Sequence, residues 1–314
     1  GLAAGYPMDA VITAKFRRKG LCSRIEAERL LAFTNTADPL FIFGAVAVGM
    51  FGLPALGPLL ATAHYLSSFT LGFFFRFYGR GDTPAEEPAP TYKGMLRRAF
   101  VALLRGREED GRPLGQLLGE AVRESVATLF MIGGFIVFFS VLVRLLTVIG
   151  LLDLLAPPAA RLLGLFGLSP PLVPALFRGL LEIDLGTVAA GRAAAPLVER
   201  VAMAGAIIAW SGLSVHGQVA SVVHRTDIRM GPYVLARLCH AILAGLYTFL
   251  LFPFFRLPVL SPAVQYCEAG FARRFILSAW QLALVYGGMV LAVLLLHLGR
   301  RCRPVWSGGR KRLA

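Results

Sequence analysis

One long uncharged apolar segment limits, more than any other feature, how this chain can fold. Phe275 to Leu298 carries no formal charge, and it exceeds the about 20 residues with which a helix crosses the hydrocarbon core of a bilayer. The composition agrees, because 56% of the 314 residues are hydrophobic and only 16% are charged, whereas about 25% are charged in soluble domains. We therefore predict an all-α fold, a polytopic α-helical membrane protein embedded in the lipid bilayer.

The net charge of +14 is concentrated between the apolar segments. Basic residues cluster in 15–24, 76–112 and 300–312, as the positive-inside rule expects for cytoplasmic flanks. We predict a multi-pass protein of the cell membrane with these loops and the C-terminal tail in the cytoplasm. A nucleic-acid partner is not expected, since such a site needs basic and aromatic side chains interleaved on a soluble face.

Sequence motifs of the common enzyme classes are missing. The chain has no Walker loop, no HExxH and no dinucleotide fingerprint, and its four cysteines form no CxxC pair and no His/Cys metal spacing. We expect no enzyme activity, no cofactor and no bound metal. A membrane-embedded enzyme that uses Glu182 and His216 ranks last, because no activated nucleophile accompanies them.

Composition divides the chain into four parts. Residues 1–78 and 114–255 are predicted to form two related repeats, and the first repeat is expected to lack its leading part. Between them, 79–113 contains GDTPAEEPAP, whose Pro and Glu bias is typical of a linker. Residues 256–314 hold the final apolar segment and the basic tail.

Polar interruptions inside two apolar segments are the candidate site. The first lies in AFTNTADPLFIFGAV (32–46) and the second in SGLSVHGQ (211–218). Inside a bilayer an interrupted helix leaves backbone groups unpaired, at several kcal/mol each unless protein, water or ligand bonds them. Interrupted helices in corresponding halves therefore point to a midplane binding site. The predicted substrate-binding residues are Asn35, Thr36, Asp38, Glu182, Ser211, Ser214, His216 and Gln218.

Each of these residues also has a structural interpretation. The segment Asn35 to Pro39 can be a packed kink, in which Asp38 caps a half-helix. His216 can simply link two helices by hydrogen bonds. We interpret Glu182 as lining the site and Asp184 as a structural partner, because intramembrane carboxylates are costly and usually functional.

Three passages resemble a known family. GYPMDAVITAKFRRKGLCSRIEAERLLAFTNTADPLFIFGAVAVGMFG, GEAVRESVATLFMIGGFIVFFSV and SGLSVHGQVASV are similar to the YlbJ-type sporulation integral membrane proteins, which carry the nucleoside-recognition or Gate domain. The resemblance implies a transporter-like core and a role in forming the spore cortex, in a membrane of the sporangium. The residues that match the motifs are Gly5, Tyr6, Pro7, Asn35, Pro39, Gly212, Ser214, His216 and Gln218.

Two functional hypotheses follow. In the first, the protein is a transporter or channel for a small polar solute, with a nucleoside-like molecule as one expectation, and Asp38, Glu182 or His216 binds a coupling cation or proton. In the second, it is a non-transporting scaffold that recruits cortex-building proteins through its loop and tail. Both leave a homo-oligomer open.

Overall fold

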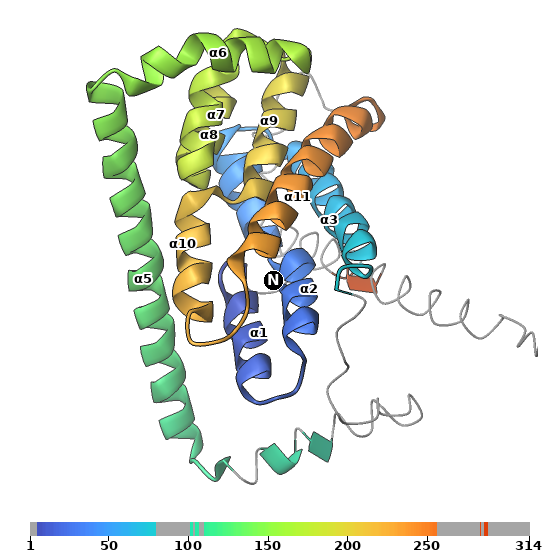
Figure 1. Cartoon of the computed structure of the whole chain (residues 1–314), viewed down its shortest axis with the longest axis vertical. Coiled ribbons are helices and arrows are strands. Elements are labelled where there is room, and N and C mark those ends of the chain that lie inside the picture. The colour runs from blue at the N-terminus through green and yellow to red at the C-terminus, as the bar shows by residue number, and fades with distance from the viewer. Residues whose placement is uncertain are drawn as a thin grey trace, which may run out of the picture. The chain divides into compact units, whose positions relative to one another are not determined.

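The computed structural model describes residues 5–79, 101–102, 104–106, 110–255, 283, 286 and 287. This part of the chain is helical and contains no strand (Figure 1), which confirms the predicted all-α class. The stretch GDTPAEEPAP of the predicted linker lies outside the described residues, as does the apolar segment 275–298 except for 283, 286 and 287. The elements are α1 (Met8–Arg18), α2 (Arg24–Thr34), the π-helix η1 (Phe41–Met50), α3 (Leu56–Phe75), α5 (Leu114–Val148), α6 (Leu151–Leu165), η2 (Pro170–Leu172), α7 (Val173–Leu181), α8 (Ile183–Arg192), α9 (Leu197–Trp210), α10 (Gly212–Val223), α11 (Met230–Leu251) and η3 (Phe252–Phe254).

Several of these helices have the length and composition to cross a membrane. Within the described residues they are Leu114–Val148, Leu197–Val223 and Met230–Phe254, with a fourth if α6 and the segment Pro170–Leu181 form one span bent by 120°. The chain is thus a polytopic membrane protein, as predicted. Helix α3 is 20 residues long but buries polar side chains such as His64, and it is not among these candidates.

The first half begins with α1 and α2, whose ends the sequence encodes locally. Ser23 caps α2, because its hydroxyl accepts the Glu26 N–H at 3.2 Å while the Glu26 carboxylate accepts the Ser23 N–H at 2.8 Å. Helix α2 ends at Thr34, the next four residues are not helical, and a helix resumes at Pro39. The predicted interruption at Asn35 is therefore confirmed.

In the second half, α7 and α8 form a hairpin and α9 and α10 form an interrupted helix. The chain turns at Glu182, which is extended with φ −147° and ψ 130°, and α8 then returns along α7 (Figure 1). Ser211, with φ 68°, separates α9 from α10. Helix α6 runs unbroken through Pro157 and Pro158.

Small residues let the first and second halves pack closely. One cluster joins Ala10, Ala14 and Leu31 of α1 and α2 to Val215 and Val219 of α10. Between helices in a membrane, such packing is stabilised by van der Waals contacts rather than by the removal of apolar surface from water. The two interruptions are held in the same core as a result.

Ion pairs join the same two halves at one polar end. Arg17 of α1 contacts Asp227 at 2.7 Å, and Arg229 contacts Glu28 of α2 at 2.9 Å. The Glu28 side chain is fully buried and also accepts a hydrogen bond from the Tyr78 hydroxyl at 2.8 Å. The basic cluster 15–24, which we predicted to be cytoplasmic, and the loop that carries Arg229 therefore lie at one end of the protein.

We predict that Glu28→Gln lowers the free energy of unfolding by about 2 kcal/mol, below the 3–5 kcal/mol of a fully buried pair because Arg229 is half exposed. Burial alone would raise the pKa of Glu28, but hydrogen bonds from Arg229 and Tyr78 hold it below the ordinary value. This stabilisation is present above the ordinary glutamate pKa of about 4.3 and is lost as the pH falls below it. Thermal unfolding of the purified protein at pH 7 and pH 4 measures both effects.

The matched control is Asp227→Asn. Its ion pair with Arg17 is exposed, so we expect a loss of at most about 1 kcal/mol. Equal losses for the two variants would contradict the importance given to the buried pair.

A second prediction concerns the α7–α8 hairpin. A Cβ atom added at Gly186 would lie 2.2 Å from the Gly179 Cα, so Gly186→Ala must push the two helices apart, at a cost of about 1–3 kcal/mol. At Gly133 of α5, nothing described lies within 4 Å of such a Cβ. Gly133→Ala should therefore leave the unfolding temperature unchanged or raise it slightly, because alanine is the better helix former, and a drop comparable to that of Gly186→Ala would refute the comparison.

Candidate functional site

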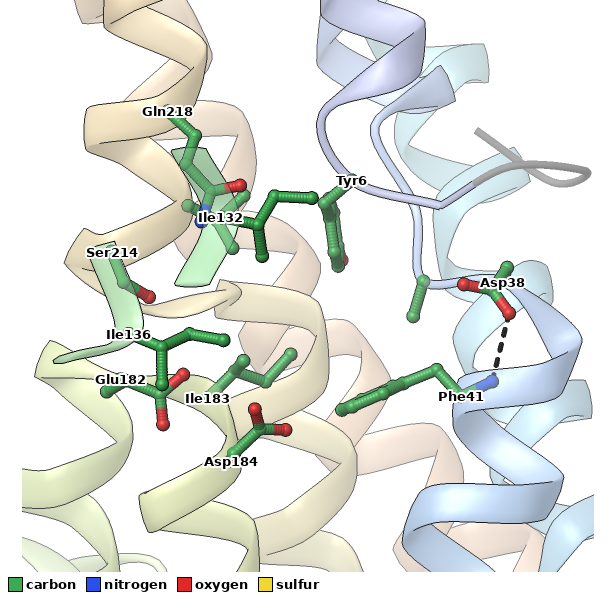
Figure 2. Close-up of a pocket in the computed structure, with 12 residues that line it drawn as sticks. Tyr6, Asp38, Phe41, Ile132, Ile136, Glu182, Ile183, Asp184, Ser214 and Gln218 are labelled. Atoms are coloured by element: carbon green, nitrogen blue, oxygen red, sulfur yellow. Dashed lines mark hydrogen bonds between the residues drawn. The ribbon is translucent and has the colours of Figure 1, made fainter. Parts of the chain in front are cut away.

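A cavity of about 160 Å³ lies where the two interruptions meet (Figure 2). Both halves line it, and α5 adds apolar side chains at one wall. Three of its side chains are carboxylates and none is basic. The lining residues are Tyr6, Ala37, Asp38, Phe41, Ile132, Ile136, Glu182, Ile183, Asp184, Ser214, Val215 and Gln218.

Helices α3 and α11 bond the backbone of the first interruption. The Ala37 N–H donates to His64 Nε2 at 3.1 Å, and the Ala37 carbonyl accepts from the Tyr65 hydroxyl at 3.0 Å. The Ser68 hydroxyl donates to the Phe33 carbonyl at 2.5 Å. Buried backbone groups that the interruption frees are thus paired by side chains from other helices, as a low-dielectric interior requires.

Arg237 of α11 supplies further bonds to this interruption. Its guanidinium, which is fully buried, donates to the carbonyls of Ala32 and Asn35. It also lies 3.0 Å from His240 Nδ1 and 5.8 Å from the centre of the Tyr233 ring. A cation placed at the C-terminal end of α2 is favoured by the helix dipole.

Asp38 closes the first interruption on the cavity side. Its Oδ1 accepts the Phe41 N–H at 2.9 Å, so it caps the helix that resumes at Pro39, one of the two roles considered for it. Gly5 approaches the same carboxylate so closely that a Cβ there would lie 2.4 Å from Asp38 Oδ2. Gly5 also has φ 63°, a left-handed backbone conformation that favours glycine, and the two observations together account for the glycine at position 5.

The second interruption is bonded differently. Glu182 Oε2 accepts the Leu185 N–H at 2.7 Å and so caps α8, and the Trp210 indole donates to the Leu180 carbonyl at 3.0 Å. A Cβ at Gly212 would lie 3.0 Å from the Glu182 Cα, so the hairpin tip rests directly against the start of α10. Glu182 Oε1 and the Ser214 hydroxyl are buried without a hydrogen-bond partner.

Of the eight predicted site residues, four line the cavity and four do not. Asp38, Glu182, Ser214 and Gln218 line it. Asp184, which we had interpreted as a structural partner, lines it as well. Sequence spacing did not identify Asp184 as a site residue, because residues two positions apart do not share one face of a helix. The turn at Glu182 nevertheless allows Glu182 and Asp184 to line the same cavity.

The other four predicted residues bond within the fold. Thr36 donates to the Thr34 carbonyl at 3.3 Å, and Ser211 to the Trp210 carbonyl at 2.5 Å. In the amide orientation that satisfies both of its ends, Asn35 donates to Asp9 Oδ1 at 2.9 Å and accepts from the Tyr233 hydroxyl. His216 Nδ1 lies 2.7 Å from the Gly212 carbonyl oxygen.

Sequence reasoning missed three groups of residues at or behind the cavity. Tyr6 lines it and donates its hydroxyl to the Ile208 carbonyl at 3.0 Å. Ile132 and Ile136 come from α5, and Arg237 supports the cavity from behind. From the sequence, only the position of an arginine inside an apolar segment could have indicated a role for Arg237.

The arrangement defines an all-α membrane protein whose two halves place interrupted helices around an acidic cavity. The chain is similar to the "Sporulation integral membrane protein YlbJ" of Bacillus subtilis (strain 168), with 42% identity over 256 residues, which is 80% of this chain and 62% of that protein. The chain thus spans less than two thirds of the length of this relative. No protein-family model and no solved structure matches the chain, so the likeness to Gate domains stays a prediction.

We predict that Arg237→Met destabilises the protein strongly, by about 3 kcal/mol or more, because it leaves two buried carbonyls without a donor. Arg237→Lys should lower the free energy of unfolding by less, because lysine retains the charge although it cannot make the bidentate hydrogen bonds of arginine. Thermal unfolding measures both, with Arg178→Met at an exposed position as the control. An unchanged unfolding temperature in Arg237→Met would show that the interruption does not depend on this side chain.

Proposed function

We propose that this protein is a transporter or channel that moves a small polar solute across a membrane, and that the cavity is its solute site. The observation that carries the proposal is the pair of unbonded buried oxygens, Glu182 Oε1 and Ser214 Oγ, in a cavity bounded by both interruptions. A buried polar atom without a partner costs about 1–3 kcal/mol. A polar ligand that bonds to it removes this cost, which favours binding at this point.

The cavity offers different chemistry on its two sides. Ser214 and Gln218 of α10 provide a hydroxyl and an amide, and Asp38 faces them from the first half (Figure 2). A solute bound between them touches both halves of the chain at once. Movement of one half against the other around a bound solute is the general mode of transporters built from interrupted helices.

The biological setting of the proposal comes from the similarity to a protein whose name assigns it to sporulation. We infer that the solute is needed in spore formation, and that its movement serves the building of the spore cortex in the sporangium. The proposed partners are the solute itself, a nucleoside-like molecule being one class to test, and a coupling cation or proton. No enzyme step forms part of the proposal.

The test is solute flux into proteoliposomes that contain the purified protein. The solutes are nucleosides, amino acids, aromatic dicarboxylates and peptidoglycan precursors. For the solute that is moved, we predict that Gln218→Ala lowers flux at least tenfold, because it removes a side chain from the cavity wall. Ser221→Ala, one turn away on α10 and exposed, should transport like the unchanged protein.

The scaffold hypothesis predicts the opposite result. A folded protein that moves none of these solutes, or whose flux Gln218→Ala does not alter, would contradict the proposed solute site. Deletion of GDTPAEEPAP would then be the next experiment, because a scaffold that recruits proteins through this loop should lose function without it.

A further inference from the structure

The charges around the cavity do not balance. Three acidic side chains, Asp38, Glu182 and Asp184, line the cavity, and no basic side chain does. Helices α8 and α10 begin beside it, but α7 and α9 end at the same two points, so the partial charges of these helix ends roughly cancel. The acidic side chains therefore have no opposite charge on the cavity wall, which favours the binding of a cation.

Unbonded oxygens mark where such a cation would lie. The side chains of Glu182 and Ser214 are buried, with 0% and 1% of their residues' surface exposed, and Glu182 Oε1 and Ser214 Oγ have no hydrogen-bond partner. Figure 2 shows both side chains on the same side of the cavity, with Asp184 next to Glu182 and Gln218 further along α10. The Glu182 carboxylate is held in place by its second oxygen, which caps α8.

We propose that an alkali cation, Na⁺ or K⁺, binds between the α7–α8 hairpin tip and the start of α10, with Glu182 Oε1 and Ser214 Oγ as ligands and Asp184 and Gln218 completing the oxygen set. The proposal deepens the proposed function by naming the coupling ion of the same cavity. Oxygen ligands suit hard cations, and the described residues contain no group of three or more His, Cys, Asp or Glu able to hold a metal ion. That ligand set favours a singly charged ion over a divalent one.

The other two groups considered for a coupling ion are less suited. Asp38 Oδ1 bonds the Phe41 N–H, and Asp38 is only half-buried, whereas Glu182 is fully buried. His216 does not line the cavity, and its ring packs between Trp210 and Tyr233 at centroid distances of 4.4 and 5.2 Å. The cation site therefore belongs to the second half of the chain.

The experiment measures thermal unfolding of the full chain in detergent while NaCl or KCl replaces choline chloride at constant ionic strength and pH. A cation that binds only the folded state raises the unfolding temperature with its concentration. We expect a saturating rise with Na⁺ or K⁺, at least a tenfold loss of apparent affinity in Glu182→Gln, and a smaller loss in Ser214→Ala. Glu124→Gln, at an exposed position of α5, should respond like the unchanged protein.

Three results would overturn the proposal. The first is an unfolding temperature that is the same in choline, Na⁺ and K⁺. The second is a cation-dependent rise in the unfolding temperature that Glu182→Gln and Ser214→Ala both retain in full. The third is a response to pH alone, which would make the site one for a proton. If Glu182→Gln does not fold, the comparison of Ser214→Ala with Glu124→Gln decides. This experiment contains no organic solute, so its result is independent of solute transport. A cation response without solute flux would support the cation site and contradict the proposed transport. Solute flux without a cation response would support the transport and contradict the cation site.

Discussion

The hydrogen bonds that side chains make to the backbone of the first interruption are the interaction on which the rest of the structure depends. Four residues of non-helical chain inside an apolar protein expose polar groups that cost several kcal/mol each when unpaired. Arg237, His64, Tyr65 and Ser68 pair with them from α11 and α3. The interruption is therefore stable only where these two helices pack against it, and its position fixes where Asp38 meets the cavity.

This arrangement separates the residues that build the interruptions from those that are free to bind. Asn35 and Thr36 lie in the interruption, yet their side chains are used within the fold. Glu182 combines both roles, because one carboxylate oxygen caps α8 while the other has no partner. A polar residue in an interrupted membrane helix is thus a reasonable candidate for a binding site. Whether it can bind a ligand depends on whether its donors and acceptors are already paired within the fold.

Local sequence signals were enough to predict the elements but not their partners. The interruption at Asn35 and the presence of membrane-spanning helices follow from neighbouring residues, and the structure contains both. Arg237 lies 202 residues from Asn35, and no spacing rule connects them. Ile136 of α5 was also missed, since periodicity identifies an apolar face without saying whether lipid or a cavity lies against it.

The two interruptions, although similar in sequence order, differ in what they leave unbonded, and this difference locates the part of the protein that can respond to a ligand. At the first, side chains from two other helices bond the backbone and the Phe41 N–H bonds Asp38, while His64 Nδ1 and Arg237 Nε are buried there without a partner. At the second, the cavity-lining oxygens of Glu182 and Ser214 are unpaired. A ligand stabilises the state to which it binds more tightly, and new bonds can form only where donors or acceptors are open. Glu182 and Ser214 line the cavity, whereas His64 and Arg237 do not. Under the proposed function, the hairpin tip of α7 and α8 against the start of α10 is therefore the part of the protein that responds to a ligand.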